Sequence, residues 1–310
     1  MPFETNSNRE EGIVVLKDTD SGTEARIFLF GALLNAFCVK TGDTTANIID
    51  GFSSPADARL RITDGFRSAK LSPFVCRLRG GNYSFEGTDY HITGHFLNGH
   101  AIHGLLFAQE YLVQDSGSND QEAFVVLTAE YRGSDMGYPF PFHITIEWKL
   151  GAGNTLSVTT CLSHKNAHAI PYTDGWHPYF TLGETVDDCT LQFDSRTQLE
   201  YDAELLPTGE RFTDTRFEKG ISLKGIEIDN SFVLEGTDPV CRLSNKRLEL
   251  TIRADAAYPI LQLYIPPHRK SIAIENLSGP PDNFNNHMNL LLLSPGEERA
   301  FTTSYSVRAL

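Results

Sequence analysis

Hydrophobic and polar residues alternate along much of this chain, as they do in half-buried β-strands. In the segment FHITIEWKL every second residue from Phe142 to Leu150 is apolar, so these side chains share one face of a strand. After the turn GAGN, the segment TLSVTTCLSH alternates again, with Leu156, Val158, Thr160 and Leu162 on one face. Residues 142–164 are therefore predicted to form an antiparallel hairpin.

The same alternation recurs in EARIFLFG, AFVVLTAEY, RLELTIRA, ILQLYIPP and FTTSYSVRAL, whereas no helical period lasts three turns. The 25 glycines and 15 prolines interrupt these segments at intervals typical of all-β proteins. The pattern predicts an all-β protein, a large antiparallel β-sandwich. Because no linker, composition shift or low-complexity stretch divides the chain, residues 1–310 are expected to form a single domain, and the lack of a short repeat argues against a propeller.

Charge and cysteine content narrow the classes of partner and compartment. The chain has 26 Lys and Arg against 40 Asp and Glu, a formal net charge of −14, which repels nucleic-acid phosphates and anionic membrane surfaces. Its five cysteines show no CxxC pair, so we expect reduced thiols rather than disulfides or a zinc site. The polar first residues, MPFETNSNREEG, and the absence of a run of about 18 apolar residues lead us to expect a cytoplasmic protein with no membrane partner.

Three loop segments concentrate polar and aromatic residues: NGHAIHGLLF, TDGWHPYF and IAIENLSGPPDNFNN. The first holds His100 and His103 close to His95, which raises the possibility of a metal site. A cupin-type metal site has an HxH pair followed by a spaced glutamate, but these histidines are five and three residues apart. We therefore expect no metal, with His95 and His100 solvated or supporting the loop.

The other two segments each contain one group capable of acid–base chemistry. His177 lies between Trp176 and Pro178 on a restricted, extended segment, where it could be structural or catalytic. The aromatic neighbours could form core or could present a face to a sugar ring. Glu275 follows an apolar strand, SIAIEN, where partial burial would make it a general base, although a rim-exposed carboxylate fits the spacing equally well.

Taken together and in order, several segments resemble the aldose 1-epimerase (galactose mutarotase) family. They are FVCRLRGGNYSFEGTDYHI, AIHG, YPFPFHITIEWKL, GWHPYFTLG, EIDNSF, LQLY and AIENLSGPPDNFN. The sequence departs from the family pattern at Cys76 and Trp176, where asparagine is usual, and at Pro178, and in this it resembles divergent bacterial members.

The resemblance implies a galactose mutarotase-like β-sandwich that exchanges the anomers of a free aldose, as a monomer or homodimer, with no metal and no organic cofactor. By matching motifs, it implies that Glu275 is the general base and His177 the general acid. It also implies that the sugar hydroxyls are held by Arg77, His103, Asp229 and Gln262, with Trp176 beside the pocket. A carboxylate next to an imidazolium would favour the ionised form of each.

Three alternatives compete with an epimerase of a neutral aldohexose: an epimerase of a charged sugar, a carbohydrate-binding protein and a metalloenzyme. A hexose 6-phosphate or a sulfonated hexose would need further cations, for which Arg79, on the same strand face as Arg77, and Lys70, in an adjacent loop, are candidates. A carbohydrate-binding protein without turnover would use the aromatic loop as a stacking platform. A cupin-type metalloenzyme is the third alternative.

Overall fold

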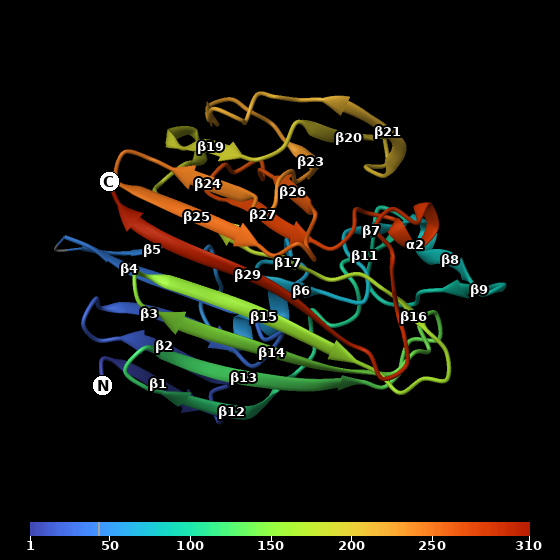
Figure 1. Ribbon diagram of the computed structural model, residues 1–310, viewed down its shortest axis with the longest axis horizontal. Helices are drawn as coiled ribbons and strands as arrows, with labels where there is room; N and C mark the ends of the chain where they lie inside the picture. Colours follow the sequence, from blue (N-terminus) through green and yellow to red (C-terminus); the bar gives the residue numbers. More distant parts are fainter. Residues whose placement is uncertain (43) are drawn as a thin grey trace.

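The computed structural model describes residues 1–42 and 44–310, and two large antiparallel sheets dominate it (Figure 1). The first sheet has nine strands among the described residues. Their order is β12 (Leu112–Ser118), β13 (Glu122–Tyr131), β14 (Phe142–Gly151), β15 (Thr155–Ser163), β29 (Glu298–Ala309), β25 (Leu248–Ala254), β24 (Val240–Ser244), β19 (Thr190–Phe193) and β22 (Ile221–Ser222).

The second large sheet carries most of the residues of interest. Its order is β21 (Pro207–Thr213), β20 (Thr197–Tyr201), β23 (Asp229–Val233), β26 (Ile260–Tyr264), β27 (Ile272–Leu277), β17 (Gly175–His177) and β6 (Ala69–Leu71), and β18 (Tyr179–Phe180) also pairs with β27. Strands that are far apart in the sequence thus lie side by side, with β17 between β27 and β6.

The two sheets pack face to face, so the predicted β-sandwich is confirmed. The indoles of Trp148 on β14 and Trp176 on β17 meet edge to face, with ring centroids 5.5 Å apart. Phe180 on β18 packs at 5.5 Å against Tyr305 on β29. One cluster of buried apolar residues extends from Phe3 to Val307. We infer from this shared core that residues 1–310 form a single domain.

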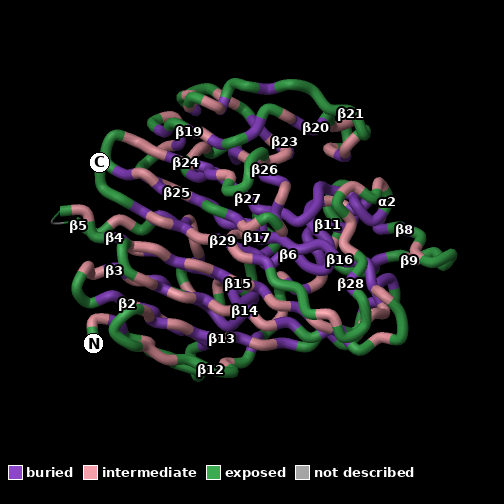
Figure 2. Tube along the Cα trace, in the orientation of Figure 1, coloured by how far each residue is buried: buried purple, intermediate pink, exposed green. Residues whose placement is uncertain are grey.

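The predicted hairpin of residues 142–164 is also confirmed. β14 and β15 pair antiparallel from His143 opposite Ser163 to Gly151 opposite Thr155. Alternate residues on both strands are buried, as the sequence pattern predicted, and Figure 2 shows this alternation along the sheet. The buried face includes Trp148, whose Nε1 donates a hydrogen bond of 2.9 Å to the Ala32 carbonyl.

An N-terminal five-stranded sheet lies against the first large sheet. It consists of β1 (Phe3–Asn8), β2 (Ile13–Asp18), β3 (Thr23–Phe28), β4 (Leu34–Thr41) and β5 (Thr44–Asn47). The Thr5 hydroxyl on β1 donates a hydrogen bond of 2.6 Å to the Gly117 carbonyl on β12. This sheet therefore covers part of the nine-stranded sheet and adds to the common core.

Short elements complete the chain. They are α1 (Pro55–Arg61), β7 (Arg77–Leu78), the 3₁₀ turn η1 (Arg79–Gly81), β8 (Asn82–Phe85), β9 (Thr88–His91), β10 (Phe96–Leu97), β11 (His100–Ile102), β16 (Ile170–Tyr172), η2 (Val186–Asp188), α2 (Asn283–Asn286) and β28 (Leu291–Leu293). β7, β8, β9, β11 and α2 gather at one end of the sandwich (Figure 1). Among the described residues, neither α-helix approaches the length needed to cross a membrane.

Candidate active site

The register of three central strands places the predicted site residues on one face of the second large sheet. Gln262 on β26 lies directly opposite Glu275 on β27, and Ser231 on β23 lies opposite Gln262. Asp229, two residues before Ser231, lies opposite Tyr264, two residues after Gln262. Paired residues, and residues two apart, share a face, so these side chains converge although their strands are far apart in the sequence.

His177 joins this face from the neighbouring strand β17. Gly175 pairs with Leu277 on β27, and a Cβ at Gly175 would lie 2.5 Å from the end of the Leu277 side chain, which would then have to move. His177, two residues later, points to the same side, with its Nε2 3.4 Å from Glu275 Oε1. Both residues are almost fully buried, at 5% and 1% exposed. The acid and base implied by the resemblance are therefore adjacent.

A cavity of about 300 Å³ opens over this face, within the range of volumes that hold small ligands. It is lined by every predicted site residue except Trp176, namely Arg77, His103, His177, Asp229, Gln262 and Glu275. The other lining residues are Thr63, Gly65, Phe66, Cys76, Leu97, Asn98, Ile102, Tyr179 and Tyr264.

Arg77 and His103 enter the cavity from a separate small sheet. β7 pairs with β11 so that Ile102 lies opposite Arg77. Cys76 and His103 adopt positive φ angles of 47° and 62°, a conformation that non-glycine residues seldom adopt. The two residues form a tight turn-like contact, in which the His103 N–H donates a 2.8 Å hydrogen bond to the Cys76 carbonyl. This turn brings the His103 ring to 4.9 Å from the His177 ring, at an angle of 88°.

Gln262 is held in one orientation by its neighbours. Its Nε2 donates a hydrogen bond of 2.8 Å to Asp229 Oδ1, while its Oε1 accepts hydrogen bonds from the Ser231 and Tyr201 hydroxyls at 2.6 and 3.0 Å. Since both ends of the amide are engaged, Gln262 and Asp229 form a fixed polar edge of the cavity.

Three buried polar atoms of the site make no hydrogen bond with any described residue: Glu275 Oε2, His103 Nδ1 and His177 Nδ1. Buried polar atoms without partners are uncommon because the lost hydration costs free energy. Their concentration in one small cavity suits a ligand that carries several hydroxyl groups.

Burial shifts both members of the acid–base pair towards their neutral forms. It raises the pKa of Glu275 well above its usual value, an effect increased by Asp229 and opposed by Arg77. It lowers the pKa of His177 to about 4. The expectation that a carboxylate and an imidazolium stabilise each other's charges was wrong for this site, because the loss of hydration outweighs their attraction. Both shifts favour a protonated Glu275 beside a neutral His177.

Trp176 does not lie where the sequence interpretation placed it. As the residue between Gly175 and His177 on β17, it points to the opposite face of the sheet, into the core, and is 3% exposed. Its indole packs against Trp148, and the Lys70 ammonium lies 4.6 Å from its ring centroid. Trp176 is therefore a core residue, and the expected position beside the sugar was wrong.

The two extra cations considered for a charged sugar also lie elsewhere. Lys70 belongs to strand β6 rather than a loop, is fully buried and pairs with Asp174. Arg79 follows the end of β7 at Leu78, so the strand alternation from Arg77 does not reach it. Its guanidinium instead forms ion pairs with Asp202 and Glu204, at 2.9 and 2.8 Å.

The positions of Glu275 and of the two remaining loop histidines are set by their surroundings. Glu275 lies within strand β27 and is buried, so a rim-exposed position was wrong. His100 Nδ1 accepts the Gly80 N–H at 3.1 Å, and His95 packs 5.5 Å from the Phe66 ring. In residues 1–42 and 44–310, no group of three or more His, Cys, Asp or Glu side chains is arranged to hold a metal ion.

Sequence interpretation missed two tyrosines of the cavity wall. Tyr179 stacks on His177 with ring centroids 5.0 Å apart, and Tyr264 lies edge-on to Tyr179 at 6.5 Å. The signal was present in the strand period, because Tyr179 follows His177 by two residues and Tyr264 follows Gln262 by two.

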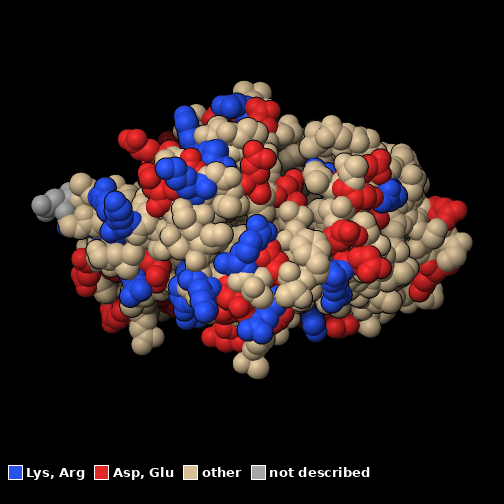
Figure 3. Space-filling model, turned by 90° about the horizontal axis from the view of Figure 1, so that it is seen from above, with Lys and Arg blue, Asp and Glu red and all other residues tan. Residues whose placement is uncertain are grey.

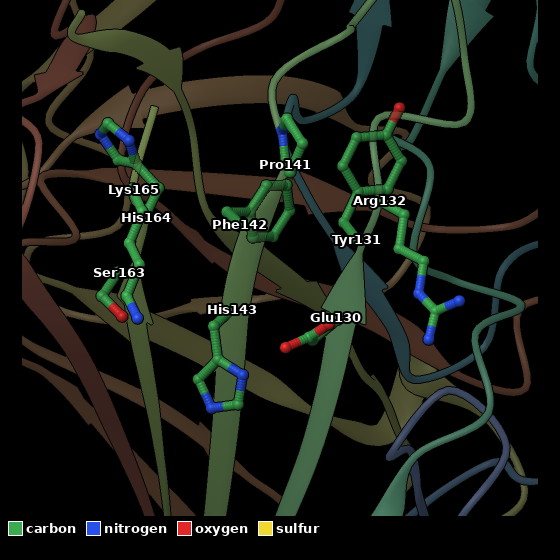
Figure 4. Close-up of a pocket in the computed structure, with 9 residues that line it drawn as sticks. All are labelled: Glu130, Tyr131, Arg132, Pro141, Phe142, His143, Ser163, His164 and Lys165. Atoms are coloured by element: carbon green, nitrogen blue, oxygen red, sulfur yellow. The ribbon is translucent and has the colours of Figure 1, made fainter. Parts of the chain in front are cut away.

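A larger groove of about 650 Å³ lies at the ends of β13, β14 and β15 (Figure 4). It is lined by Glu130, Tyr131, Arg132, Pro141, Phe142, His143, Ser163, His164 and Lys165. None of the predicted site residues contributes to it, and its His143 bonds to Thr128 rather than to a carboxylate. We therefore place the candidate active site in the smaller, more buried cavity.

Comparison with solved structures supports the same fold class. A galactose mutarotase-like protein from Clostridium acetobutylicum has a TM-score of 0.85 at 17% identity, covering 99% of this chain and 98% of that one. Galactose 1-epimerase from Lactobacillus acidophilus has a TM-score of 0.82 at 19% identity, with coverage of 99% and 98%. The architecture is thus a galactose mutarotase-like β-sandwich, as expected.

Sequence comparison gives the family. The sequence model of the aldose 1-epimerase family matches residues 13–306. The uncharacterized protein YihR of Escherichia coli strain K12 is 27% identical over 249 residues, which cover 77% of this chain and 78% of that protein. The chain belongs to the aldose 1-epimerase family, and it is an isomerase of the epimerase or mutarotase type that acts on carbohydrates.

Proposed function

We propose that the protein is an aldose 1-epimerase that interconverts the α and β anomers of a free aldohexose such as glucose or galactose. The observation that carries this proposal is the buried pair of His177 and Glu275, 3.4 Å apart at one wall of a cavity sized for a small ligand. Anomer exchange needs an acid and a base that act on the same ring, which this pair can supply.

In the proposed reaction, a proton first moves from Glu275 to His177. The resulting Glu275 carboxylate then removes the proton from the C1 hydroxyl while the C1–O5 bond breaks. The His177 imidazolium gives its proton to the ring oxygen, which leaves a free aldehyde at C1. Rotation about C1–C2 presents the other face of the carbonyl, and reclosure reverses both proton transfers. No atom is gained or lost over the cycle, and each group typically contributes about 10²- to 10⁴-fold to the rate.

The burial of the pair makes the ionised state, through which ring opening and reclosure both pass, reactive. Opening converts a carboxylate and an imidazolium into a neutral acid and a neutral imidazole. Since burial raises the pKa of Glu275 and lowers that of His177, the neutral pair is the favoured state of the cavity. The same desolvation makes Glu275 a stronger base and protonated His177 a stronger acid.

Four residues would hold the sugar between the two catalysts. The Arg77 guanidinium is a fixed set of donors, and Asp229 and Gln262 form the polar edge opposite. His103 is kept neutral because burial lowers its pKa well below the usual value, with His177 and Arg77 adding to the effect. A neutral imidazole can donate to one hydroxyl and accept from another.

The charge of the cavity favours a neutral hexose over a phosphorylated or sulfonated one. In the described part of the chain, Arg77 is the only lysine or arginine that lines it, and its charge acts on the carboxyl groups of Asp229 and Glu275. A second anionic group on the sugar would lack a cation of its own. A binding protein without turnover is disfavoured because binding alone does not need the adjacent acid and base, His177 and Glu275, in the cavity.

We also propose that the enzyme acts in the cytoplasm, as a monomer or homodimer, without nucleic-acid or membrane partners. All five cysteines are free thiols, which suits a reducing compartment. Acidic and basic side chains are interspersed on the face in Figure 3, and the net charge of −14 disfavours contact with phosphate backbones. Light scattering after gel filtration would give the oligomeric state.

The decisive experiment is exchange NMR on equilibrated aldoses and their 6-phosphates, with and without the protein, in a buffer that catalyses mutarotation slowly. We expect faster exchange between the anomers of glucose or galactose. Acceleration restricted to the phosphates would instead assign a charged sugar as the substrate. A folded sample that binds sugars without accelerating exchange would reject catalysis.

A further inference from the structure

Phe66 lies within a small cluster of rings and lines the cavity of the candidate active site. Its ring centroid is 4.5 Å from that of His103, 5.2 Å from that of Phe107 and 5.5 Å from that of His95. Phe66 is almost fully buried, at 3% exposed. Both Phe107 and His95 meet it edge to face, so the ring that contacts His103 is itself held in place.

The backbone at Phe66 adopts an uncommon conformation. Phe66 and Ser68 both have a positive φ angle of 55°. The Ala69 N–H donates a hydrogen bond of 3.0 Å to the Phe66 carbonyl, which closes a turn over residues 66–69. A positive φ at the third residue of such a turn usually calls for glycine. Two non-glycine residues with positive φ in one turn cost free energy, and strain of this kind is concentrated at functional sites.

This turn is tied directly to the strand that carries the proposed acid. The Ser68 N–H donates a hydrogen bond of 2.9 Å to the His177 carbonyl. The next residue, Ala69, lies opposite His177 in the pairing of β6 with β17. The Ser68 hydroxyl is buried and makes no hydrogen bond with any described residue, so Ser68 contributes here through its backbone. The turn therefore fixes the place of Phe66 relative to His177.

The imidazole of His103 has few other contacts that could orient it. Its Nδ1 is buried and makes no hydrogen bond with any described residue. In the described part of the chain, its ring contacts are with Phe66, at an angle of 59°, and with His177, at 88°. The packing of Phe66 therefore decides how His103 presents its two nitrogens to the cavity.

We propose that Phe66 is a positioning residue, whose ring holds the His103 imidazole at a right angle to the ring of His177 and so in place to bind a sugar hydroxyl. This inference rests on the proposed anomer exchange. Phe66 also helps to bury His103. That burial lowers the pKa of His103 well below its usual value, and three nearby groups add to the effect, namely His177, Arg77 and His95. A neutral imidazole can both donate to and accept from hydroxyls.

The first test follows the titration of His103 by NMR, with its resonance assigned by its loss in His103→Gln. In the wild type we expect His103 to stay neutral to well below pH 6.5, about the pKa of an exposed histidine. In Phe66→Ala water reaches the imidazole, so the pKa of His103 should rise towards that value. Identical titrations of the wild type and a folded Phe66→Ala would overturn the proposal.

The second test separates positioning from a loss of folded protein. In exchange NMR with galactose, Phe66→Ala should raise KM about tenfold, the effect of losing about one hydrogen bond to the sugar, while kcat changes much less. Partial unfolding would instead lower the apparent kcat at an unchanged KM, and that result would overturn the proposal. Phe30→Ala is the matched control, since Phe30 is buried in the same apolar cluster but does not line the cavity. Its KM should equal that of the wild type.

A Phe66→Leu variant keeps the proposal testable if Phe66→Ala does not fold, because leucine retains much of the buried apolar volume. It should raise KM and the pKa of His103 by less than alanine does. A folded Phe66→Leu with the KM and the His103 titration of the wild type would overturn the proposal. If the wild type exchanged neither galactose nor any other aldose, the proposed reaction would fail, whereas the His103 titration would still decide the role of Phe66.

Discussion

Lys70 and Asp174 form an ion pair between the two sheets in which neither side chain is exposed to solvent. Nζ lies 2.5 Å from Asp174 Oδ2, and the carboxylate also accepts hydrogen bonds from the Tyr258 and Tyr172 hydroxyls at 2.6 and 2.8 Å. In the pairing of β6 with β17, Lys70 lies opposite Trp176, which directly precedes His177, the proposed acid. The pair thus anchors the strand that carries the proposed acid.

Removal of one partner of this ion pair should destabilise the fold strongly. Lys70→Met would leave the Asp174 charge buried without its cation, and such losses typically cost about 3–5 kcal/mol in the free energy of unfolding. The double variant Lys70→Met, Asp174→Asn should cost less, because neither charge remains. Urea unfolding of the three proteins measures this, and equal losses in the single and double variants would contradict the assignment.

The His177–Glu275 pair makes a prediction about turnover. His177→Ala and Glu275→Gln should each lower kcat about 10²- to 10⁴-fold with little change in the unfolding midpoint. Because the two groups act as a unit, the double variant should lose little more than the worse single one. Exchange NMR gives the rates, and circular dichroism controls for folding. Near wild-type rates in folded single variants would remove these residues from the mechanism.

The pH dependence of exchange follows from the same pair. Since burial lowers the pKa of His177 to about 4 and raises that of Glu275, the pair holds one proton between these values. Below about pH 4 a second proton binds to His177, Glu275 can no longer ionise, and kcat/KM should fall. Above the raised pKa of Glu275 the proton is lost and kcat/KM should fall again. A profile with an acid limb near pH 6.5, roughly the value of an exposed histidine, would contradict the lowered pKa of His177.

Strand period and motif order predicted most of the fold and of the candidate site. The alternation in residues 142–164 was sufficient to predict the hairpin, because one face of β14 and β15 is buried and the other is not. Arg77, His103, His177, Asp229, Gln262 and Glu275 were identified by matching motifs, and only the register of β23, β26, β27 and β17 shows why they meet.

The failures have physical causes that a single sequence hides. The sequence could not predict which face of the sheet His177 points to. Strand β17 has only three residues, Gly175, Trp176 and His177, and all are buried, so its pattern does not alternate. Lys70 looks like a surface residue in a sequence, and its burial depends on Asp174, 104 residues away. The pKa directions at Glu275 and His177 depend on the desolvation of the cavity, which a motif does not encode.

The core position of Trp176 gives a prediction that separates stability from sugar binding. Trp176→Phe would remove part of the indole that packs against Trp148 and lies beneath the Lys70 ammonium. We expect a loss of about 1–2 kcal/mol in the free energy of unfolding, less than the roughly 3–5 kcal/mol typical of truncation of a buried tryptophan to alanine. The KM for the aldose should stay within about twofold, since Trp176 does not line the cavity.

A Tyr179→Ala variant gives the contrast, because Tyr179 stacks on His177 inside the cavity and its loss should raise KM. If Trp176→Phe raised KM as much as Tyr179→Ala while the protein stayed as stable as the wild type, the indole would have to reach the sugar, and β17 would have to present its opposite face to the cavity.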